Sequence, residues 1–318
     1  MSVDLSVVIC THNPRTDYFQ RVLNALRNQT LPLTSWELVI VDNASDSPVL
    51  GGWDVAWHPH SKVIREDELG LTPARLRGIR ESTCDLLLFV DDDNVLDENY
   101  LDRVLRLMRE HPYLVVIGAG RIEPEFETPP SPELVPILPM LALRSVSSLM
   151  WSNNPKDNEC IPWGAGLCVR RTTAESYAAL VGLLKCSAVL DRKGQQLFCG
   201  GDDLFSWAAA RSGKGFGIFP ELRVLHLILP GRLTRSYFLR LIHDHSFSHG
   251  VLRYLLANME PEPAGVPGFL KILLHGTRNG SFSMRCRFAS FRGTAAARQF
   301  ISTERLTPVS DTTSALPV

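Results

Sequence analysis

The sequence predicts an α/β fold in which a mostly parallel sheet is flanked by helices. Short apolar and β-branched runs alternate with amphipathic helical segments through the first 120 residues, which is the order of strand-helix-strand units. These runs are apolar on both faces, as expected for strands buried between two helical layers. At 318 residues and 45% hydrophobic content, the chain can bury a large core.

The expected elements follow this alternation in chain order. Strands are predicted at 5–11, 36–42, 62–66, 85–94 and 114–120, and helices at 16–29, 72–82 and 97–111. Seven prolines between 121 and 160 predict an irregular crossing segment. A strand and turn at 161–171, helices near 172–185 and after 200–203, and one or two strands at 215–229 complete a first domain at 1–232.

The C-terminal part is predicted to be helical. Residues 234–257 indicate one long amphipathic helix or two short ones, within an extension at 233–305, and the tail at 306–318 is expected to be disordered. The longest apolar stretch, 134–151, is interrupted by prolines and an arginine, and the first residues lack the basic region of a signal peptide. We therefore expect no transmembrane helix and a cytoplasmic protein.

Charge and cysteine content exclude two further classes. Lys and Arg number 33 against 34 Asp and Glu, without the basic excess of a dedicated nucleic-acid-binding protein, so no nucleic acid partner is expected. The seven cysteines are an odd number and form no CxxC pair, which favours reduced thiols over a disulfide framework or a zinc site.

Two glycine-rich nucleotide-binding motifs are absent from the sequence. GxGxxG does not follow the first strand and GxxxxGK[ST] does not occur, which argues against a Rossmann dehydrogenase and P-loop chemistry.

Polar residues follow the predicted strands where open α/β sheets bind ligands, at the C-terminal strand ends. Thr11 ends the first strand, Asp42 the second, and Asp91, Asp92 and Asp93 the fourth. Repulsion among three adjacent carboxylates favours a neutralising cation, and a divalent metal is the natural partner. If the strand persists through them, Asp91 and Asp93 point away from Asp92. A helix cap is the alternative interpretation.

Three other groups could carry chemistry. GGDD at 200–203 opens a helix, so one of its carboxylates could be a general base, or both could simply cap the helix. His226 in an apolar run could bind a metal or be a satisfied core histidine, and Arg75 could hold phosphate or form a surface ion pair. His245 and His249, four residues apart, are better explained as a solvated helix face than as a zinc site.

Taken in order, these pieces resemble the family 2 glycosyltransferases with the GT-A fold. The matching segments are SVVICTHN, VDNAS, GLTPARLRGI, FVDDDN, WGAGLCVRR, GGDD and VLH, and they span about residues 3–245. The resemblance implies a GT-A catalytic domain at 1–232, with a nucleotide-binding half at 1–120 and an acceptor and catalytic half at 121–232.

The resemblance also implies roles for individual residues. Contacts with the nucleotide sugar are implied for Thr11, Asp42, Arg75, Asp91, Asp92, Trp163 and Gly164. Asp93 and His226 are implied to bind a divalent metal, Mn or Mg. Asp202 aligns with the catalytic base of the family's Glu-Asp pair, but Gly201 replaces the Glu, so Asp203 stays an alternative base.

The function implied is inverting, metal-dependent transfer of a sugar from a nucleotide-diphospho sugar to an acceptor hydroxyl, in surface glycan or glycolipid biosynthesis. The acceptor would be a glycan, a lipid-linked molecule or a small molecule. One alternative is a sugar-1-phosphate nucleotidyltransferase, although THNPRTD after the first strand lacks the glycine-rich loop of that class. The other is a non-catalytic sugar-nucleotide-binding module, for which Gly201 is the only hint.

The C-terminal extension prompts a hypothesis about location. Residues 268–293 mix apolar and basic side chains, a composition that suits peripheral contact with the inner face of a membrane. Packing of an ordinary helix onto the catalytic domain is the alternative explanation.

Overall fold

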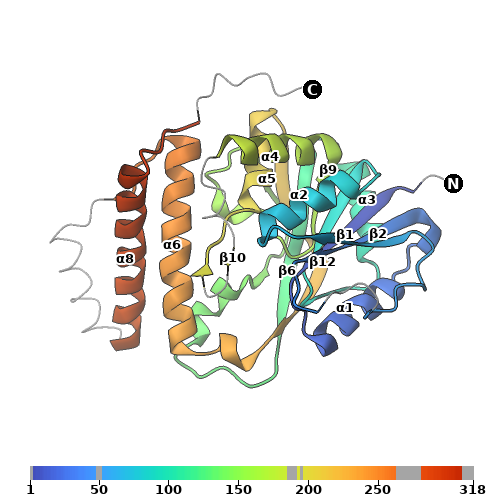
Figure 1. Cartoon of the computed structure of the whole chain (residues 1–318), viewed down its shortest axis with the longest axis horizontal. Helices are drawn as coiled ribbons and strands as arrows, with labels where there is room; N and C mark the ends of the chain where they lie inside the picture. The colour runs from blue at the N-terminus through green and yellow to red at the C-terminus, as the bar shows by residue number, and fades with distance from the viewer. Residues whose placement is uncertain (1–2, 48–51, 185–191, 194–195, 263–280, 310–318) are drawn as a thin grey trace.

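The computed structural model describes residues 3–47, 52–184, 192–193, 196–262 and 281–309. Its centre is a ten-stranded sheet with the main strand order β3-β2-β1-β4-β9-β6-β12-β5, while β7 pairs with β6 and β8 with β12 (Figure 1). Along the main path only β9 and β5 run against the other strands. The predicted α/β class with a mostly parallel sheet is therefore confirmed.

The strands occupy the predicted segments closely. Their bounds are β1 Leu5–Thr11, β2 Trp36–Asn43, β3 Ser61–Glu66, β4 Leu86–Val90, β5 Asn94–Leu96, β6 Leu114–Phe126, β7 Arg144–Ser145, β8 Met150–Ser152, β9 Leu167–Arg170, β10 Arg192–Lys193, β11 Gln196–Leu197 and β12 Gly215–Ile228. The helices are α1 Thr16–Arg27, α2 Leu71–Glu81, α3 Tyr100–Glu110, α4 Arg171–Leu183, α5 Asp203–Arg211, α6 Arg235–Ala257 and α8 Ser281–Thr303. Short 3-10 turns lie at Leu33–Ser35 (η1), Val135–Leu141 (η2), Asn158–Cys160 (η3) and Pro230–Arg232 (η5).

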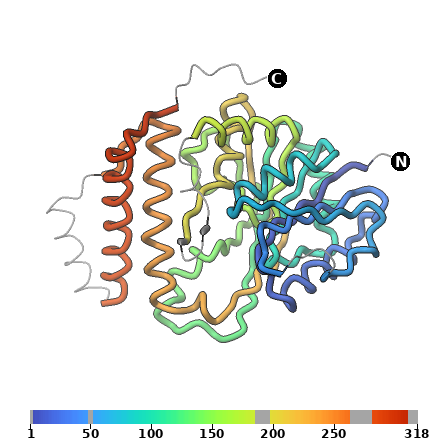
Figure 2. The backbone as a smooth tube through the Cα atoms, in the orientation of Figure 1, coloured from blue at the N-terminus to red at the C-terminus, as the bar shows by residue number. Residues whose placement is uncertain are grey.

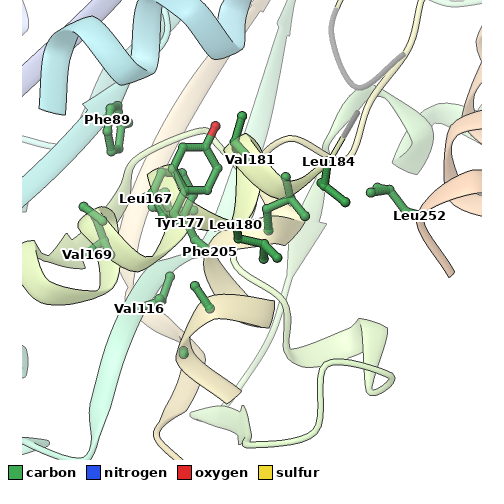
Figure 3. Close-up of a cluster of buried hydrophobic side chains, with 14 of the residues drawn as sticks. Phe89, Val116, Leu167, Val169, Tyr177, Leu180, Val181, Leu184, Phe205 and Leu252 are labelled. Atoms are coloured by element: carbon green, nitrogen blue, oxygen red, sulfur yellow. The ribbon is translucent and has the colours of Figure 1, made fainter. Parts of the chain in front are cut away.

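Two helical layers cover the sheet, and the alternation along β1 shows how. Val7 and Ile9 pack with α1 and α3 on one face, while Val8 packs with α2, α4 and α5 on the other, because successive strand side chains point to opposite faces. On the second face the Tyr177 ring of α4 stacks on Phe205 of α5 with centroids 3.9 Å apart (Figure 3). Both faces of the central strands are therefore buried, as their apolar sequences predicted.

Two expectations about strand boundaries were wrong. The strand predicted at 85–94 ends at Val90, and the chain turns so that the Asn94 amide bonds the Asp91 carbonyl at 3.2 Å. The three aspartates consequently lie in a turn rather than alternating along a strand. The crossing segment at 121–160 is only partly irregular, because β6 continues to Phe126 beside β12 and β7 and β8 join the sheet.

The C-terminal extension is a pair of helices beside the sheet domain (Figures 1 and 2). The 234–257 segment forms one uninterrupted helix, α6, whose first turn is capped by the Thr234 hydroxyl accepting from the Tyr237 amide. α8 packs along α6 through Gly293, which touches the His243 carbonyl, and Ala297, which touches Gly250. The inner side of α6 joins the same hydrophobic cluster as α4 and α5.

The end of the described chain departs from the expected disordered tail. Val309 donates its amide to the Leu255 carbonyl at 2.8 Å, and the Tyr254 hydroxyl bonds the Leu306 carbonyl at 3.2 Å. Residues 306–309 thus pack on α6, while 310–318 lie outside the described residues. Half of the apolar and basic segment 268–293, residues 268–280, also lies outside them, and its remainder begins α8.

Two negative findings concern the described residues alone. The six described cysteines form no disulfide with one another. Among the described helices, none combines the length and apolarity needed to cross a bilayer.

Candidate active site

The register of the sheet brings the first strand ends together. Thr11 is paired with Asp42 across β1 and β2, and on its other side its hydroxyl donates to Asp92, which follows β4. Thr11 is only 3% exposed and Asp42 only 1%. The predicted nucleoside residues therefore form one row along the C-terminal edge of the parallel strands.

Asp42 and its neighbour shape the loops around this row. The Asp42 carboxylate accepts from the Ser45 amide at 3.2 Å and from the Arg65 guanidinium at 3.3 Å. The Asn43 side chain accepts from the Gly70 amide at 2.8 Å and donates to the Glu68 carbonyl at 2.7 Å. Asn43 thus fixes the entry to α2, the helix that carries Arg75.

The acidic turn is held by its own asparagine. The Asn94 amide group donates to Asp93 at 2.7 Å and to Asp91 at 3.3 Å. Burial, together with the nearby charges of Asp93 and Asp91, raises the pKa of Asp92 to about 7. The turn therefore concentrates more negative charge than its surroundings neutralise, as the sequence suggested.

Arg75 connects this turn to the GGDD segment. It is 4% exposed, and although burial opposes its charge, the charges of Asp202, Tyr177 and Asp91 raise the pKa of Arg75 above its ordinary value. A side chain at Gly164 would collide with it, because a Cβ there would lie 2.6 Å from Arg75 Nη2. The acidic residues predicted from separate segments thus converge on one buried cation.

The two GGDD carboxylates differ in environment. Asp202 accepts a hydrogen bond from the Gly164 amide at 2.8 Å, and its charge acts on the neighbouring Arg75. Burial and the charge of Asp202 raise the pKa of Asp203. A raised pKa favours the protonated form of Asp203, which makes Asp203 less suited to accept a proton.

Trp163 precedes Gly164 and is covered by a cation that the sequence did not indicate. The Arg144 guanidinium of β7 lies 3.3 Å from the centroid of the Trp163 ring. Arg144 also donates to the Ile161 carbonyl at 2.9 Å. Burial lowers the pKa of Arg144 to about 10, against the opposing influence of Asp202 and Asp203.

The predicted metal residues also meet. The antiparallel pairing of β12 with β5 sets His226 opposite Asn94, so that His226 Nε2 lies 3.3 Å from Asp93 Oδ2. Arg232 Nη1 donates to both of these atoms at 3.0 Å. Among the described residues, no group of three or more His, Cys, Asp or Glu side chains is arranged to hold a metal ion.

A hollow opens beside Asp203, on the side of α6. It is lined by Lys156, Trp207, His249 and Arg253, among others. The His249 ring stacks on His245 at 5.8 Å between centroids, and burial with the nearby charges of His245 and Arg253 lowers the pKa of His249 to about 4. His245 is exposed, as expected of a solvated helix face, whereas His249 is half-buried and lines the hollow.

Sequence reasoning missed the cations Arg144 and Arg232 and the contribution of α6. Arg144 sits in the proline-rich segment, and Arg232 follows the strand that carries His226. Neither has a local pattern that marks it, because each reaches the site through the pairing of distant strands. The position of Arg232, six residues beyond His226, is the only hint available from the sequence.

Comparison with known proteins gives a family model and several relatives. Residues 6–148 match the model described as Glycosyl transferase family 2. Two curated relatives named as glycosyltransferases are EpsH of Bacillus subtilis (strain 168), 28% identical over 114 residues, and AglE of Haloferax volcanii, 29% identical over 102 residues. These matches cover 35% and 31% of this chain, and they span 32% and 33% of the two relatives, about a third of each.

A solved structure gives the same fold. It is described as GalNAc-T7 with UDP, GalNAc and Mn2+, and it aligns with a TM-score of 0.51 and 16% identity. The alignment covers 89% of this chain and 56% of that one. At this identity the similarity establishes the architecture, a mostly parallel sheet between helical layers, and the predicted GT-A fold is confirmed.

Proposed function

We propose, from the match of residues 6–148 to the family model described as Glycosyl transferase family 2, that this chain transfers a sugar from a nucleotide-diphospho sugar to an acceptor hydroxyl with inversion. One observation carries the proposal. Arg75 is buried between Asp91 of the acidic turn and Asp202 of the GGDD segment. The donor-side carboxylates and the general base therefore act on the same buried arginine, as expected if they serve one displacement.

In this reaction Asp202 is the base. As the acceptor oxygen attacks the anomeric carbon, the bond from that carbon to the diphosphate oxygen breaks, and the hydroxyl proton passes to the Asp202 carboxylate. Such a positioned base accelerates transfer by about 10² to 10⁴. The Gly164 amide that bonds Asp202 orients the carboxylate.

On the donor side, Thr11 and Asp42 line the nucleoside pocket, and Asp91 and Asp92 face the ribose and diphosphate. We propose uridine diphosphate as the first nucleotide to test, because the structural neighbour GalNAc-T7 was solved with UDP. Trp163 and Gly164 then lie where the transferred sugar and the acceptor meet. Their backbone contact with Asp202 supports this placement.

A divalent metal, Mn or Mg, fits Asp93 and His226. Their Oδ2 and Nε2 atoms are 3.3 Å apart and both accept from one nitrogen of Arg232, so their lone pairs converge on one cationic position. Carboxylate and imidazole together suit Mn²⁺, which also accompanied UDP in the GalNAc-T7 structure. When bound, the metal would supply positive charge for the departing diphosphate.

The acceptor is proposed to enter through the hollow between η3 and α6. Lys156 and Arg253 line it and are exposed, and the described residues place no carboxylate within 4.0 Å of either cationic group. An acceptor with an anionic group would suit them, whether it is a glycan, a lipid-linked molecule or a small molecule. A role in surface glycan or glycolipid synthesis at the inner face of a membrane follows from such acceptors.

The experiment that tests the function pairs binding with transfer. Thermal unfolding is followed with UDP and other nucleoside diphosphates, with and without Mn²⁺, and transfer is followed with the labelled sugar nucleotide that binds. Ligand at 100 times its Kd stabilises the fold by about 2.7 kcal/mol. Asp202→Asn should keep the binding and lose transfer, while Asp102→Asn, an exposed acid on α3, should keep both.

Two outcomes would replace the proposal. Release of pyrophosphate from a nucleoside triphosphate would identify a sugar-1-phosphate nucleotidyltransferase. Binding of a sugar nucleotide with neither transfer nor hydrolysis in the wild type would identify a sugar-nucleotide-binding module.

A further inference from the structure

Arg232 occupies the point on which the two proposed metal ligands converge. It ends η5, the short turn that follows β12, and its side chain is 14% exposed. Its Nη1 lies 3.0 Å from Asp93 Oδ2 and 3.0 Å from His226 Nε2. One guanidinium nitrogen thus contacts both atoms that would bind a metal.

The contacts show which atoms face the guanidinium. Arginine has only donors, so His226 Nε2 accepts from Arg232 Nη1. Nε2 thus offers Arg232 the lone pair that it would offer a metal. Asp93 and His226 are thus held ready as ligands while Arg232 supplies the positive charge.

Two nitrogens beside these contacts are not satisfied by the described residues. Within the described chain, Arg232 Nε and His226 Nδ1 are buried without a hydrogen-bond partner. Tyr237, in the first turn of α6, also interacts with the guanidinium. Arg232 is the last residue of η5, whereas His226 belongs to β12 and Asp93 to the turn after β4, so its side chain can withdraw by rotating about its own bonds without moving either ligand.

We propose that Arg232 is the resident cation of the Asp93–His226 pair and competes with a divalent metal for it. The proposal rests on the proposed function, which assigns the metal to these two residues. Metal–ligand distances of about 2.0 to 2.2 Å would place the ion between Oδ2 and Nε2, where the Arg232 N–H groups now point. The ion and the guanidinium cannot occupy that position together, because their atoms would overlap and because both are positively charged.

The proposal predicts that removing the guanidinium strengthens metal binding. Mn²⁺ binding to the intact chain, without nucleotide, is measured from the electron paramagnetic resonance signal of free Mn²⁺. Arg232→Gln should lower the Kd for Mn²⁺ by about tenfold or more, which corresponds to about 1.4 kcal/mol. The added substitution Asp93→Asn should abolish that gain.

A matched control lies three residues away. Arg235 begins α6, is exposed, and pairs with Glu133 rather than with Asp93. Arg235→Gln removes the same charge from the same region and should leave the Kd for Mn²⁺ unchanged. An equal increase in Mn²⁺ affinity in both variants would show that the loss of any nearby positive charge is sufficient, and it would overturn the proposal. Unchanged or weaker Mn²⁺ binding by Arg232→Gln would overturn it as well.

A second measurement uses the wild-type protein, so its result does not depend on how a variant folds. In the wild type, the Arg232 Nε–Hε resonance, assigned by its absence in Arg232→Lys, should shift during titration with diamagnetic Mg²⁺ with the midpoint of metal binding. An unshifted resonance at saturating Mg²⁺ would contradict displacement.

The outcomes separate this proposal from the function. Sugar transfer by the wild type with no gain of Mn²⁺ affinity in Arg232→Gln would overturn the role of Arg232 alone. Stronger Mn²⁺ binding in that variant without any transfer by the wild type would overturn the function and leave the competition standing.

Discussion

The donor side and the acceptor side of the site are built differently. On the donor side, Thr11, Asp42 and Arg75 are at most 4% exposed and lie on or beside the central strands. On the acceptor side, Lys156 and Arg253 are exposed and come from a 3-10 loop region and from α6. One side is fixed by the sheet register, and the other is assembled from segments that the sheet does not position.

This difference has a physical consequence for recognition. Buried polar groups that already have partners are costly to leave unpaired, so the donor pocket discriminates strongly against ligands that do not match it. Exposed cations each contribute little and tolerate variation. We therefore expect narrow specificity for the nucleotide and broader tolerance for the acceptor, and the following substitutions test that contrast.

The largest effect is expected at Arg75. Arg75→Gln removes the buried cation shared by Asp91 and Asp202 and leaves these two half-buried carboxylates uncompensated, which costs about 3 kcal/mol of unfolding free energy. Chemical denaturation measures this loss. Arg27→Gln, an exposed arginine at the end of α1, is the control and should change stability by less than about 0.5 kcal/mol. Equal stability of the two variants would show that Arg75 does not compensate the charges of Asp91 and Asp202.

Gly164 tests how closely the donor and acceptor sides meet. Gly164→Ala places a Cβ 2.6 Å from Arg75 Nη2 and 3.6 Å from Asp202 Oδ2, so the guanidinium must shift, at a cost of about 1–3 kcal/mol. Transfer should fall while nucleoside diphosphate affinity is retained, because Thr11 and Asp42 are untouched. Gly182→Ala on α4 meets nothing within 4 Å and should leave transfer unchanged. A loss of nucleotide binding in Gly164→Ala would place Gly164 on the donor side instead.

The same contrast explains what the sequence could predict. β1, β2 and β4 have apolar periodicity and β-branched residues, and parallel register then aligns Thr11, Asp42 and Asp92 without further information. The acidic turn was misplaced on a strand, because periodicity does not show where β4 stops and β5 reverses toward β12.

The partners that complete the site were not predictable in this way. Arg75 and Asp202 were each singled out, but their meeting depends on how α2 and α5 pack on the same face of the sheet. Arg144, Arg232 and His249 reach the site only through strand pairing and the packing of α6. Arg144 has no neighbour along the chain that would mark it, and the sequence offers only the nearby His226 and His245 as signs of Arg232 and His249.

The acceptor side should respond to acid through His249. Its pKa is lowered to about 4 mainly by burial, so the folded protein keeps it neutral while the unfolded chain takes up a proton near pH 6.5. Stability contributed by this group is present above about pH 6.5 and is lost as pH falls toward 4. His249→Gln should therefore lessen acid destabilisation between pH 7 and 5 by about 1 kcal/mol. His111→Gln, at the C-terminal end of α3, should not, and identical pH profiles for wild type and His249→Gln would contradict the assignment.

The smallest effect is expected from the two cations of the hollow, and it should be confined to acceptors that carry a phosphate. Lys156 and Arg253 are exposed, and the nearby Asp157 is engaged by Ser152 at 2.6 Å rather than by Lys156. Lys156→Gln with Arg253→Gln should raise KM about fivefold for phosphorylated acceptors and leave KM for neutral ones unchanged, since an exposed charge contact is worth up to about 1 kcal/mol. Lys214→Gln, exposed before β12, is the control. A rise in KM for the nucleotide sugar would instead place these cations on the donor side, and the difference between the two sides would disappear.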